Sequence, residues 1–525
     1  MRTRSWVSVV FGVALVLVTL LWGVPQSTMP RPPAALAAGA ALPQSLVVAD
    51  IGDLQTLDGT LRVVTNHRRL YGNIYETLAT RDPKTQQIVP LLAAGWEKHG
   101  DTAWIFHIRK GVKFHDGGPL TAADVKFSLD RAKDPKISQA AASVKLARVD
   151  VVDDYTVRIT TVGIDPLALT RVTDLGFIGE KAYFDRAGAT EFGLKPVGTG
   201  PYKFVRWDKG SQVVMTANDG YWGGPVPVKN LTFKFIPDAA TRVAALLSGE
   251  VDIAAEIPPE LGARIDSSPN ASISSQTDPM AVGVWLKPLA APLNNRMVRQ
   301  ALNYAVNKDA IVKTIWAGRA TVLGSPLFPG IFGYDSAVKP YPYDPAKAKT
   351  MLAQAGYPNG FTFHTDVPIG GVPLAKEAAE AVAGDLARVG VKMEMRTLEW
   401  AGFLKNVFTP RSEATAESMV LYIKTPSLDG DGILSPTFPC DAVYPAGWNW
   451  GVYCNPQVDK LIATEAHALS PKVRERVMGQ ISQMLHDDAP WIYLYAPTQQ
   501  FGVKKSLPWK AREDGMIFAW HDLKP

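Results

Sequence analysis

The chain has 525 residues, of which 46% are hydrophobic and 20% are charged, and its formal net charge is +5. A chain of this length exceeds what one hydrophobic core organises, so it predicts two or three domains. Arg2, Arg4 and Arg31 precede a predicted processing site, and without them the net charge falls to about +2, which argues against a nucleic-acid-binding protein.

The first 40 residues predict an export signal. An apolar run from Trp6 to Val24 follows two arginines, and two A-x-A sequences between Ala35 and Ala40 fit a cleavage site. We interpret residues 1–40 as a cleaved signal peptide rather than a retained anchor, although the run approaches the roughly 20 residues that span a bilayer. No cysteine occurs before Cys440, which excludes lipid attachment at a signal-peptide cysteine. The predicted location is therefore the periplasm.

Periodicity and turn residues predict alternating strands and helices in the rest of the chain. Trp104–Arg109 has the period-two pattern of a half-buried strand, and Thr121, with Asp124 three residues later, is placed to cap a helix. The other predicted strands are Ser45–Asp50, Val112–Phe114, Val144–Thr161 with a turn at Asp153–Asp154, Glu250–Ile253 and Val391–Leu398. The other predicted helices are Arg69–Leu78, a helix between Pro237 and Gly249, Asn295–Ile311, Asp344–Gly356 and Ala378–Val389.

Several segments match the motifs of one family in order. They are Asn73–Leu78 (N-x-Y-E-x-L), Pro90–Trp96 (P-x-L-A-x-x-W), Trp104–Ser128, Gly249–Ile253 (a helix end, then E-V-D-I), Asn295–Ile311 and Tyr453–Lys460 (Y-x-N-P-Q-V-D-K). From about residue 45 to about residue 500, the chain resembles the family 5 extracytoplasmic solute-binding proteins, which are the dipeptide- and oligopeptide-binding subunits of bacterial ABC importers.

The resemblance implies an α/β fold of the bilobal periplasmic-binding-protein type (type II, the large class with an extra domain), with a ligand cleft between two hinged lobes. Placed on this chain, domain I would comprise residues 42–85, 196–284 and 500–525. The inserted extra domain would be 86–195, and the opposing lobe 285–499. The hinges would lie near Trp285–Pro288 and near Pro497–Phe501.

Enzyme motifs are missing from the sequence. We find no G-x-S-x-G elbow, no H-E-x-x-H, no phosphate-binding loop and no G-x-G-x-x-G. The eight histidines show no metal-ligand spacing, and His107 and His115 are interpreted as structural. We therefore expect no catalysis, no cofactor and no metal bound directly by this chain.

A binding cleft needs aromatic walls and a few polar groups that fix the ligand. Candidate ligand-binding residues, most of them in the segment Leu421–Cys454, are Asn73, Tyr75, Trp285, Trp400, Tyr422, Asp429, Asp431, Trp448, Asn449 and Trp450. For each aromatic side chain, core or hinge packing is an open alternative. For Asn73 and Tyr75, burial is the preferred alternative.

The aspartates of Asp429-Gly430-Asp431 depart from the family pattern. In the dipeptide binders that the chain resembles, an aspartate upstream of an Asp-Pro-Asp element binds the ligand's ammonium group. The corresponding position here falls near Pro426 and Ser427, where the sequence has no carboxylate. Asp429 or Asp431 could instead bind a cationic ligand, but a turn aspartate that bonds its own backbone is the preferred alternative.

The two cysteines, Cys440 and Cys454, predict a disulfide, because an isolated pair in an oxidising compartment usually forms one and a metal site would need more ligands. The predicted function is the periplasmic substrate-binding subunit of an ABC importer, which captures a peptide or peptide-like solute by lobe closure. The expected partners are that ligand and the membrane permease subunits, with the ATPase subunits reached through them, and we expect a monomer.

Two alternatives stay open. One is the same role for a non-peptide cargo, such as an oligosaccharide, an opine-like compound, or a nickel or haem complex. The other is a periplasmic chaperone or sensory co-receptor on the same fold.

Overall fold

The computed structural model describes residues 42–61, 65–82, 85, 87–138, 145–174, 176–369, 371–408, 416–425, 427–444 and 446–523. The predicted signal peptide lies outside these residues, and Leu42–Pro525 form one compact unit. Within the described part of the chain, no helix combines the length and the hydropathy that a membrane span requires.

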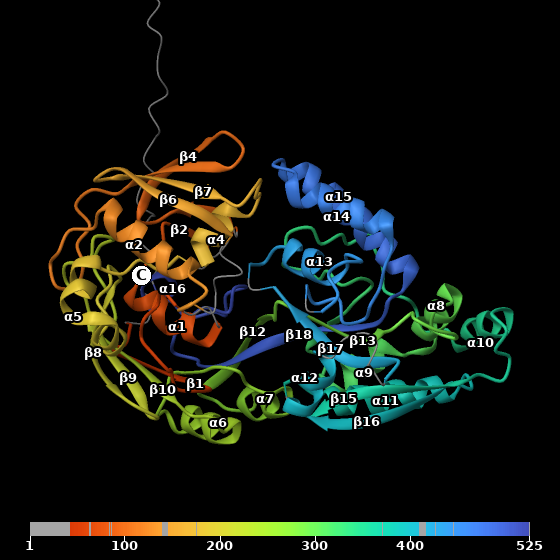
Figure 1. Ribbon diagram of the computed structural model, residues 1–525. Helices are drawn as coiled ribbons and strands as arrows, with labels where there is room; N and C mark the ends of the chain where they lie inside the picture. The colour runs from red at the N-terminus through yellow and green to blue at the C-terminus, as the bar shows by residue number, and fades with distance from the viewer. Residues whose placement is uncertain are drawn as a thin grey trace, which may run out of the picture. The chain divides into compact units, whose positions relative to one another are not determined.

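One long strand, β18 (Trp491–Lys504), joins the two halves of a twelve-stranded sheet. Residues 491–495 of β18 pair with β13 (Met280–Leu286), and residues 498–504 pair with β12 (Ala271–Thr277). The strand order is β16-β15-β17-β13-β18-β11-β1-β10-β9-β8, and β12 and β14 also pair with β18. Figure 1 shows β18 as a long blue strand that extends from the strands around β13 toward β12.

We call the strands on either side of this join the first and second halves of the sheet. The first half contains β1 (Ser45–Asp50), β8 (Tyr202–Asp208), β9 (Gln212–Ala217), β10 (Asn230–Phe235), β11 (Ile253–Ala254) and β12. The second half contains β13, β14 (Ala320–Val322), β15 (Thr362–Ile369), β16 (Lys392–Glu399) and β17 (Ser418–Lys424).

Each half of the sheet has hydrophobic cores of its own. The helices of the first half are α1 (Thr65–Ile74), α6 (Ala239–Ser248), α7 (Pro259–Asp266) and α16 (Ala519–Asp522). The helices of the second half are α8 (Arg296–Ala305), α9 (Lys308–Ile315), α10 (Pro345–Gln354), α11 (Ala375–Ala387), α12 (Trp400–Val407), α13 (Asp431–Thr437), α14 (Pro456–His467) and α15 (Pro471–Asp488). The core of the second half extends from Met280 to Ala496.

A separate four-stranded sheet has a third core, which includes Phe106, Val125 and Leu129. Its strands are β4 (Ala93–His99), β5 (Ala103–Ile108), β7 (Thr156–Thr161) and β6 (Leu146–Asp153), in that order across the sheet. The remaining elements of this part of the chain are a two-stranded pair, β2 (Ala79–Arg81) with β3 (Ile88–Pro90), and the helices α2 (Ala122–Lys133), α4 (Ala168–Asp174) and α5 (Lys181–Leu194).

Most sequence-predicted elements are present with small shifts of their ends. The capping prediction for α2 is confirmed, because the Asp124 carboxylate accepts a hydrogen bond from the backbone N–H of Thr121 at 2.9 Å. Asp238 and Gly249 begin and end α6 as N-cap and C-cap. The helix predicted at 69–78 lies at 65–74.

The strand predicted at 250–253 is reduced to β11 at 253–254, because the backbone N–H groups of Glu250 and Val251 donate back to the Ala245 carbonyl of α6. Two further element predictions were wrong. Val112–Phe114 is not a strand, because the chain turns at once: the Phe114 N–H donates to the Gly118 carbonyl at 2.8 Å, which leaves a single bridge between Lys113 and Pro119. The helix predicted at 295–311 is two helices, α8 and α9. Asn307 interrupts it, because its side chain accepts from the Ala310 N–H at 3.0 Å and caps α9.

The chain passes from the first half to the second between β12 and β13, at Asp278 and Pro279. This crossover comes earlier than the first hinge predicted at 285–288. Trp285 lies within β13, where it pairs with Trp491, and is fully buried. The second passage, in β18 between residues 495 and 498, adjoins the predicted hinge at 497–501. The domain boundaries themselves stay a prediction.

Candidate functional site

The parallel strands of both halves end near polar residues. In the second half, β15 runs parallel to β16 and β17, and these three strands end at Ile369, Glu399 and Lys424. In the first half, β1 runs parallel to β10 and β11, and β1 ends at Asp50. Open α/β sheets bind ligands outside the carboxyl ends of their strands, so these ends, together with the crossover, define the candidate site.

On the first-half side of this site, Arg69 from α1 binds two carboxylates. Its guanidinium donates to Asp50, at the end of β1, at 3.1 and 3.3 Å, and to Glu256, just after β11, at 2.7 Å. Arg69 is fully buried, whereas the Glu256 side chain is 33% exposed. Gln499 in β18 also donates to Glu256 at 2.7 Å. The Glu256 carboxylate beside the crossover is therefore hydrogen-bonded by both Arg69 and Gln499 and still reaches solvent.

On the second-half side, Lys424 at the end of β17 binds Asp278 of the crossover at 3.1 Å. Burial opposes the charge on Lys424, but the carboxylates of Asp278 and Glu256 hold its pKa above the ordinary value. Burial likewise opposes the charge on Glu256, and Arg69 and Lys424 hold its pKa below the ordinary value. Lys424 and Glu256 are thus charged, and their attraction acts between the two halves.

Arg81, at the end of β2, contacts the second half directly. Its guanidinium donates to the backbone carbonyl of Ser427 at 2.6 Å and lies 3.9 Å from the Asp174 carboxylate. Ser427 follows β17 by three residues, in the loop that leads to Asp429. A side chain from the first part of the chain thereby reaches the loop at the carboxyl end of β17.

Three of the predicted site residues are buried and fully used by the fold. The Asn73 amide donates to the carbonyls of Arg69 and Ile517 and accepts from the Ala519 N–H. The Tyr75 hydroxyl donates to the Leu57 carbonyl at 3.0 Å. The Asn449 amide donates to the Pro439 and Tyr453 carbonyls and accepts from the Tyr453 N–H. For Asn73 and Tyr75 these contacts agree with the burial alternative, and the Asn449 amide is likewise bonded within its own loop.

Asp429 and Asp431 stabilise the loop after β17 through contacts with other residues of the fold. Asp429 forms a bidentate pair with buried Arg474 of α15, with N–O distances of 2.8 and 2.7 Å, and also accepts from the Asp431 N–H. Asp431 accepts a hydrogen bond from Ser435. Glu465 of α14 lies against the same arginine at 3.2 Å, and burial together with Asp431 raises its pKa to about 9.

The predicted aromatic residues divide into two sets. Trp285 stacks on Trp491 with ring centroids 4.2 Å apart and lies 5.7 Å from Trp450, so it belongs to the core. Trp400 begins α12 directly after the end of β16 and stacks on Phe403 at 5.6 Å. Trp400 and Tyr422 are half-buried, and Trp448 is 45% exposed. Trp400 and Tyr422 therefore lie near the carboxyl ends, whereas Trp285 is covered.

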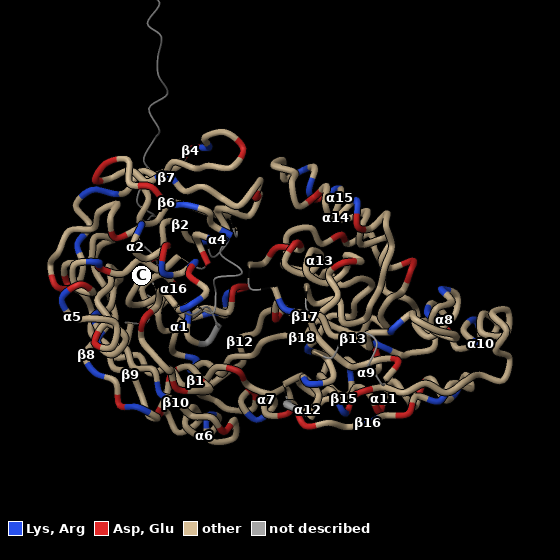
Figure 2. The backbone as a smooth tube through the Cα atoms, in the orientation of Figure 1, with Lys and Arg blue, Asp and Glu red and all other residues tan. Residues whose placement is uncertain are grey.

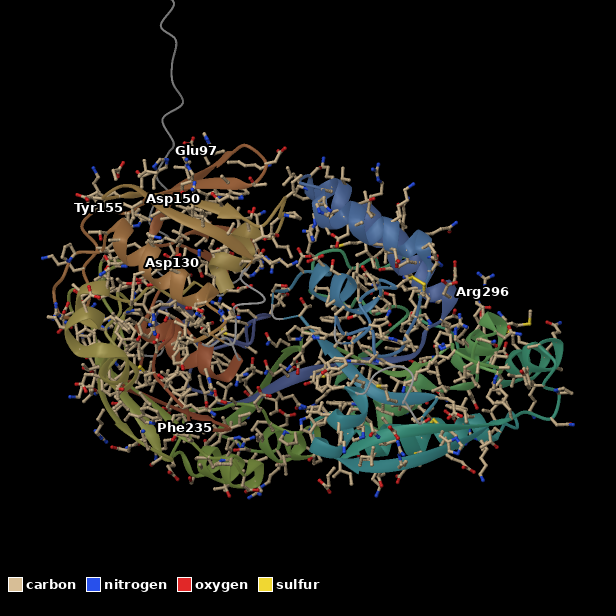
Figure 3. All side chains as sticks on the ribbon, in the orientation of Figure 1. Glu97, Asp130, Asp150, Tyr155, Phe235 and Arg296 are labelled. Atoms are coloured by element: carbon tan, nitrogen blue, oxygen red, sulfur yellow. A yellow bond between two sulfur atoms is a disulfide. The ribbon has the colours of Figure 1, made fainter. Side chains whose placement is uncertain are left out.

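The predicted disulfide between Cys440 and Cys454 is confirmed (Figure 3). Among the described residues, no group of three or more histidine, cysteine, aspartate or glutamate side chains is arranged to hold a metal ion. Figure 2 shows Lys and Arg interspersed with Asp and Glu along the described chain.

Sequence reasoning missed Glu256, Lys424 and Arg81. Glu256 stands two residues beyond the carboxyl end of β11, and Lys424 stands at the carboxyl end of β17. This position is the signal that could have found them. Arg81 carries no such signal, because its contact with Ser427 joins residues 346 positions apart.

Comparisons with known proteins identify the family. The model for bacterial extracellular solute-binding proteins, family 5 (Middle), matches residues 87–444. The chain belongs to this family. Heme-binding protein A of Haemophilus influenzae is 32% identical over 460 residues, covering 82% of each chain. The dipeptide-binding protein of Escherichia coli is 30% identical over 462 residues, covering 83% of this chain and 85% of that one.

Solved structures of family 5 proteins confirm the predicted fold class. HbpA2 from Haemophilus parasuis superposes with a TM-score of 0.82 at 27% identity, covering 92% of this chain and 100% of that chain. DppA from Helicobacter pylori, in complex with the peptide STSA, gives a TM-score of 0.72 at 28% identity, covering 91% of this chain and 97% of that chain. Family 5 proteins are substrate-binding components of transport, so the predicted class of function is confirmed.

Proposed function

We propose that this family 5 protein captures a peptide or peptide-like solute in the periplasm and presents it to an ABC permease. The observation that carries the proposal is the pair of carboxyl ends at the crossover, where groups of both signs are partly exposed. Glu256 offers a carboxylate for an ammonium group, and Lys424 offers an ammonium for a carboxylate. A zwitterionic ligand suits such a site because charge-assisted hydrogen bonds are stronger than neutral ones.

Binding would draw the two halves together around the ligand. Just two chain passages join the halves within the described residues, at Asp278–Pro279 and within β18, and Arg81 already reaches Ser427. Ligand contacts to both halves would favour the arrangement in which they lie closest. The protein then works by binding and movement, with no chemical step.

Trp400 and Tyr422 are the aromatic residues we assign to the ligand wall. Both are half-buried near the ends of β16 and β17. The names of two relatives support a peptide-like cargo: the E. coli relative is a dipeptide-binding protein, and the relative from Pectobacterium atrosepticum, 31% identical over 435 residues, is a glutathione-binding protein. Heme-binding protein A of Haemophilus influenzae supports the non-peptide alternative instead.

Native mass spectrometry of the purified chain, followed by release and sequencing of the retained molecule, tests the proposal. We expect a short peptide or a peptide conjugate. Trp400→Ala and Lys424→Met should each lower the retained fraction, while Lys392→Met, an exposed lysine on β16, should leave it unchanged. Recovery of haem, a sugar or an opine would overturn the peptide cargo. Equal retention of the ligand by all variants would overturn the assignment of Trp400 and Lys424 to the ligand site.

Gene deletion distinguishes a transport role from a chaperone or sensory role. Deleting the gene should abolish uptake of the recovered molecule. Normal uptake in the deletion strain would favour the chaperone or co-receptor alternative.

A further inference from the structure

A small pocket on the second half is lined by a lysine whose ammonium has no hydrogen-bond or ion-pair partner among the described residues. The pocket lies between the C-terminal end of α12, the start of β17 and the disulfide loop. Lys287 lines it and is 8% exposed. The ammonium of Lys287 makes no hydrogen bond or ion pair with any described residue. The Lys287 nitrogen is not among the buried unsatisfied polar atoms of the described residues, so it reaches solvent and is open to an anionic ligand that enters the pocket.

A second unpaired donor lines the same pocket. Tyr444 is half-buried, and its hydroxyl makes no hydrogen bond to a described residue. The other polar side chains there are occupied: the amide of Asn406 donates to Asp366, and Asn449 is held by the disulfide loop. The two groups left open are thus an ammonium and a phenolic hydroxyl, which together favour an anionic acceptor.

The rest of the lining is apolar. Val407, Met419, Val443, Trp450 and Val452 form the walls. The cavity measures about 20 Å³, which admits a water molecule or the terminal group of a ligand but not a whole ligand. Burial lowers the pKa of the Lys287 ammonium, although Asp366 and Glu417 act in the opposite direction.

Exposed aromatic and aliphatic side chains form the rim of the pocket. Phe408 is 41% exposed, and its ring lies 5.3 Å from that of Tyr444 and 5.8 Å from that of Trp450. Leu289 is 40% exposed and also lines the pocket. A ligand whose charged end enters the cavity would lay its apolar body on this rim.

We propose that this pocket binds the carboxylate of a small organic acid with an aromatic or aliphatic body, with Lys287 and Tyr444 as its donors. The site is distinct from the crossover site. Met419 and Lys424 are five residues apart in β17, which is about 17 Å at roughly 3.3 Å per residue, and Lys287 follows the end of β13 that lies away from the crossover.

Calorimetric titration of the purified protein with phenylacetate tests this assignment. We expect saturable binding of phenylacetate and binding about ten-fold weaker or less for the neutral isostere phenylacetamide, because the lost contact is charge-assisted. Lys287→Met should weaken phenylacetate binding by about ten-fold or more, and Tyr444→Phe should weaken it to a smaller extent. Lys392→Met should have no effect.

Folding does not confuse this test, because Lys287→Met breaks no hydrogen bond or ion pair among the described residues and should change thermal stability little. The crossover variant Trp400→Ala should bind phenylacetate like the parent protein, whatever becomes of its peptide cargo. Phenylacetate binding that is lost in Trp400→Ala and kept in Lys287→Met would overturn the proposal. Equal affinity for acid and amide, or no binding of either, would also overturn it.

Discussion

At the scale of single residues, the loop beyond β17 depends on a buried arginine. Arg474 is 5% exposed and holds both carboxylate oxygens of Asp429, with Glu465 beside it. We expect Arg474→Met to destabilise the fold by about 3–5 kcal/mol, because it leaves buried carboxylates without their cation. Urea denaturation measures this change. Arg476→Met, two residues further along α15 and exposed, should cost less than about 0.5 kcal/mol.

Equal stability of the two variants would show that the loop does not depend on the charge of Arg474. If Arg474→Met were as stable as Arg476→Met, the pair with Asp429 would contribute no net stability, as happens for some buried ion pairs. The loop could then be held by its backbone contacts alone, such as the hydrogen bond from the Phe332 N–H to the Leu428 carbonyl at 2.9 Å.

At the scale of elements, the turn at His115 joins the four-stranded sheet's domain to the segment before β8. The Nδ1 atom of His115 accepts from the Gly198 N–H at 3.3 Å, and Nε2 donates to the Gly200 carbonyl at 3.0 Å. This arrangement requires the neutral ring, and burial lowers the pKa of His115 to about 4 from its ordinary value of 6.5.

The pH dependence follows from that arrangement. Between pH 4 and 6.5 the unfolded chain binds a proton at His115 that the folded chain does not, so this contribution to stability is lost as the pH falls below 6.5. Because His115 favours the folded state more as the pH rises across this range, the pH dependence of the urea unfolding midpoint should be less positive in His115→Gln than in the parent protein. His99→Gln, at an exposed position, should keep the full slope. Parallel slopes in all three proteins would contradict the assignment.

The disulfide loop is the second element with a measurable contribution. Cys440 and Cys454 are 14 positions apart, and closing a loop of that length stabilises a fold by about 3 kcal/mol in the chain-entropy model. We expect dithiothreitol to lower the free energy of unfolding of the parent protein by about that amount, which urea denaturation shows as a lower midpoint. The double variant Cys440→Ala/Cys454→Ala should start at the lower midpoint and show no response to the reductant.

The sequence predicted local structure well and the site poorly, for a physical reason. Caps, turns and apolar faces are set by neighbours in sequence, so Thr121 and Gly249 were placed correctly. Whether a polar side chain faces a ligand or a core depends on distant partners. Asn73 is used by residues 517 and 519, and Asp429 by residue 474, and no local pattern shows those contacts.

At the scale of the whole molecule, one contact between residues distant in sequence can test the proposed closure of the two halves. The hydrogen bond from Arg81 to the Ser427 carbonyl connects the two parts of the chain that a ligand would draw together. If this contact belongs to the ligand-bound arrangement, then Arg81→Met should weaken retention of the co-purified cargo by about ten-fold or more, the range expected for a lost charge-assisted hydrogen bond. Native mass spectrometry at graded dilution measures the retained fraction.

Its control is Arg148→Met, because Arg148 is an exposed arginine of β6 that pairs with Asp150. Faster loss of cargo from Arg81→Met, with an unchanged unfolding midpoint, would place the effect in closure rather than in stability. Retention equal to that of Arg148→Met would mean that ligand contacts alone hold the two halves together. Arg81 would then be a residue of the first part of the chain that touches the loop after β17 without contributing to capture.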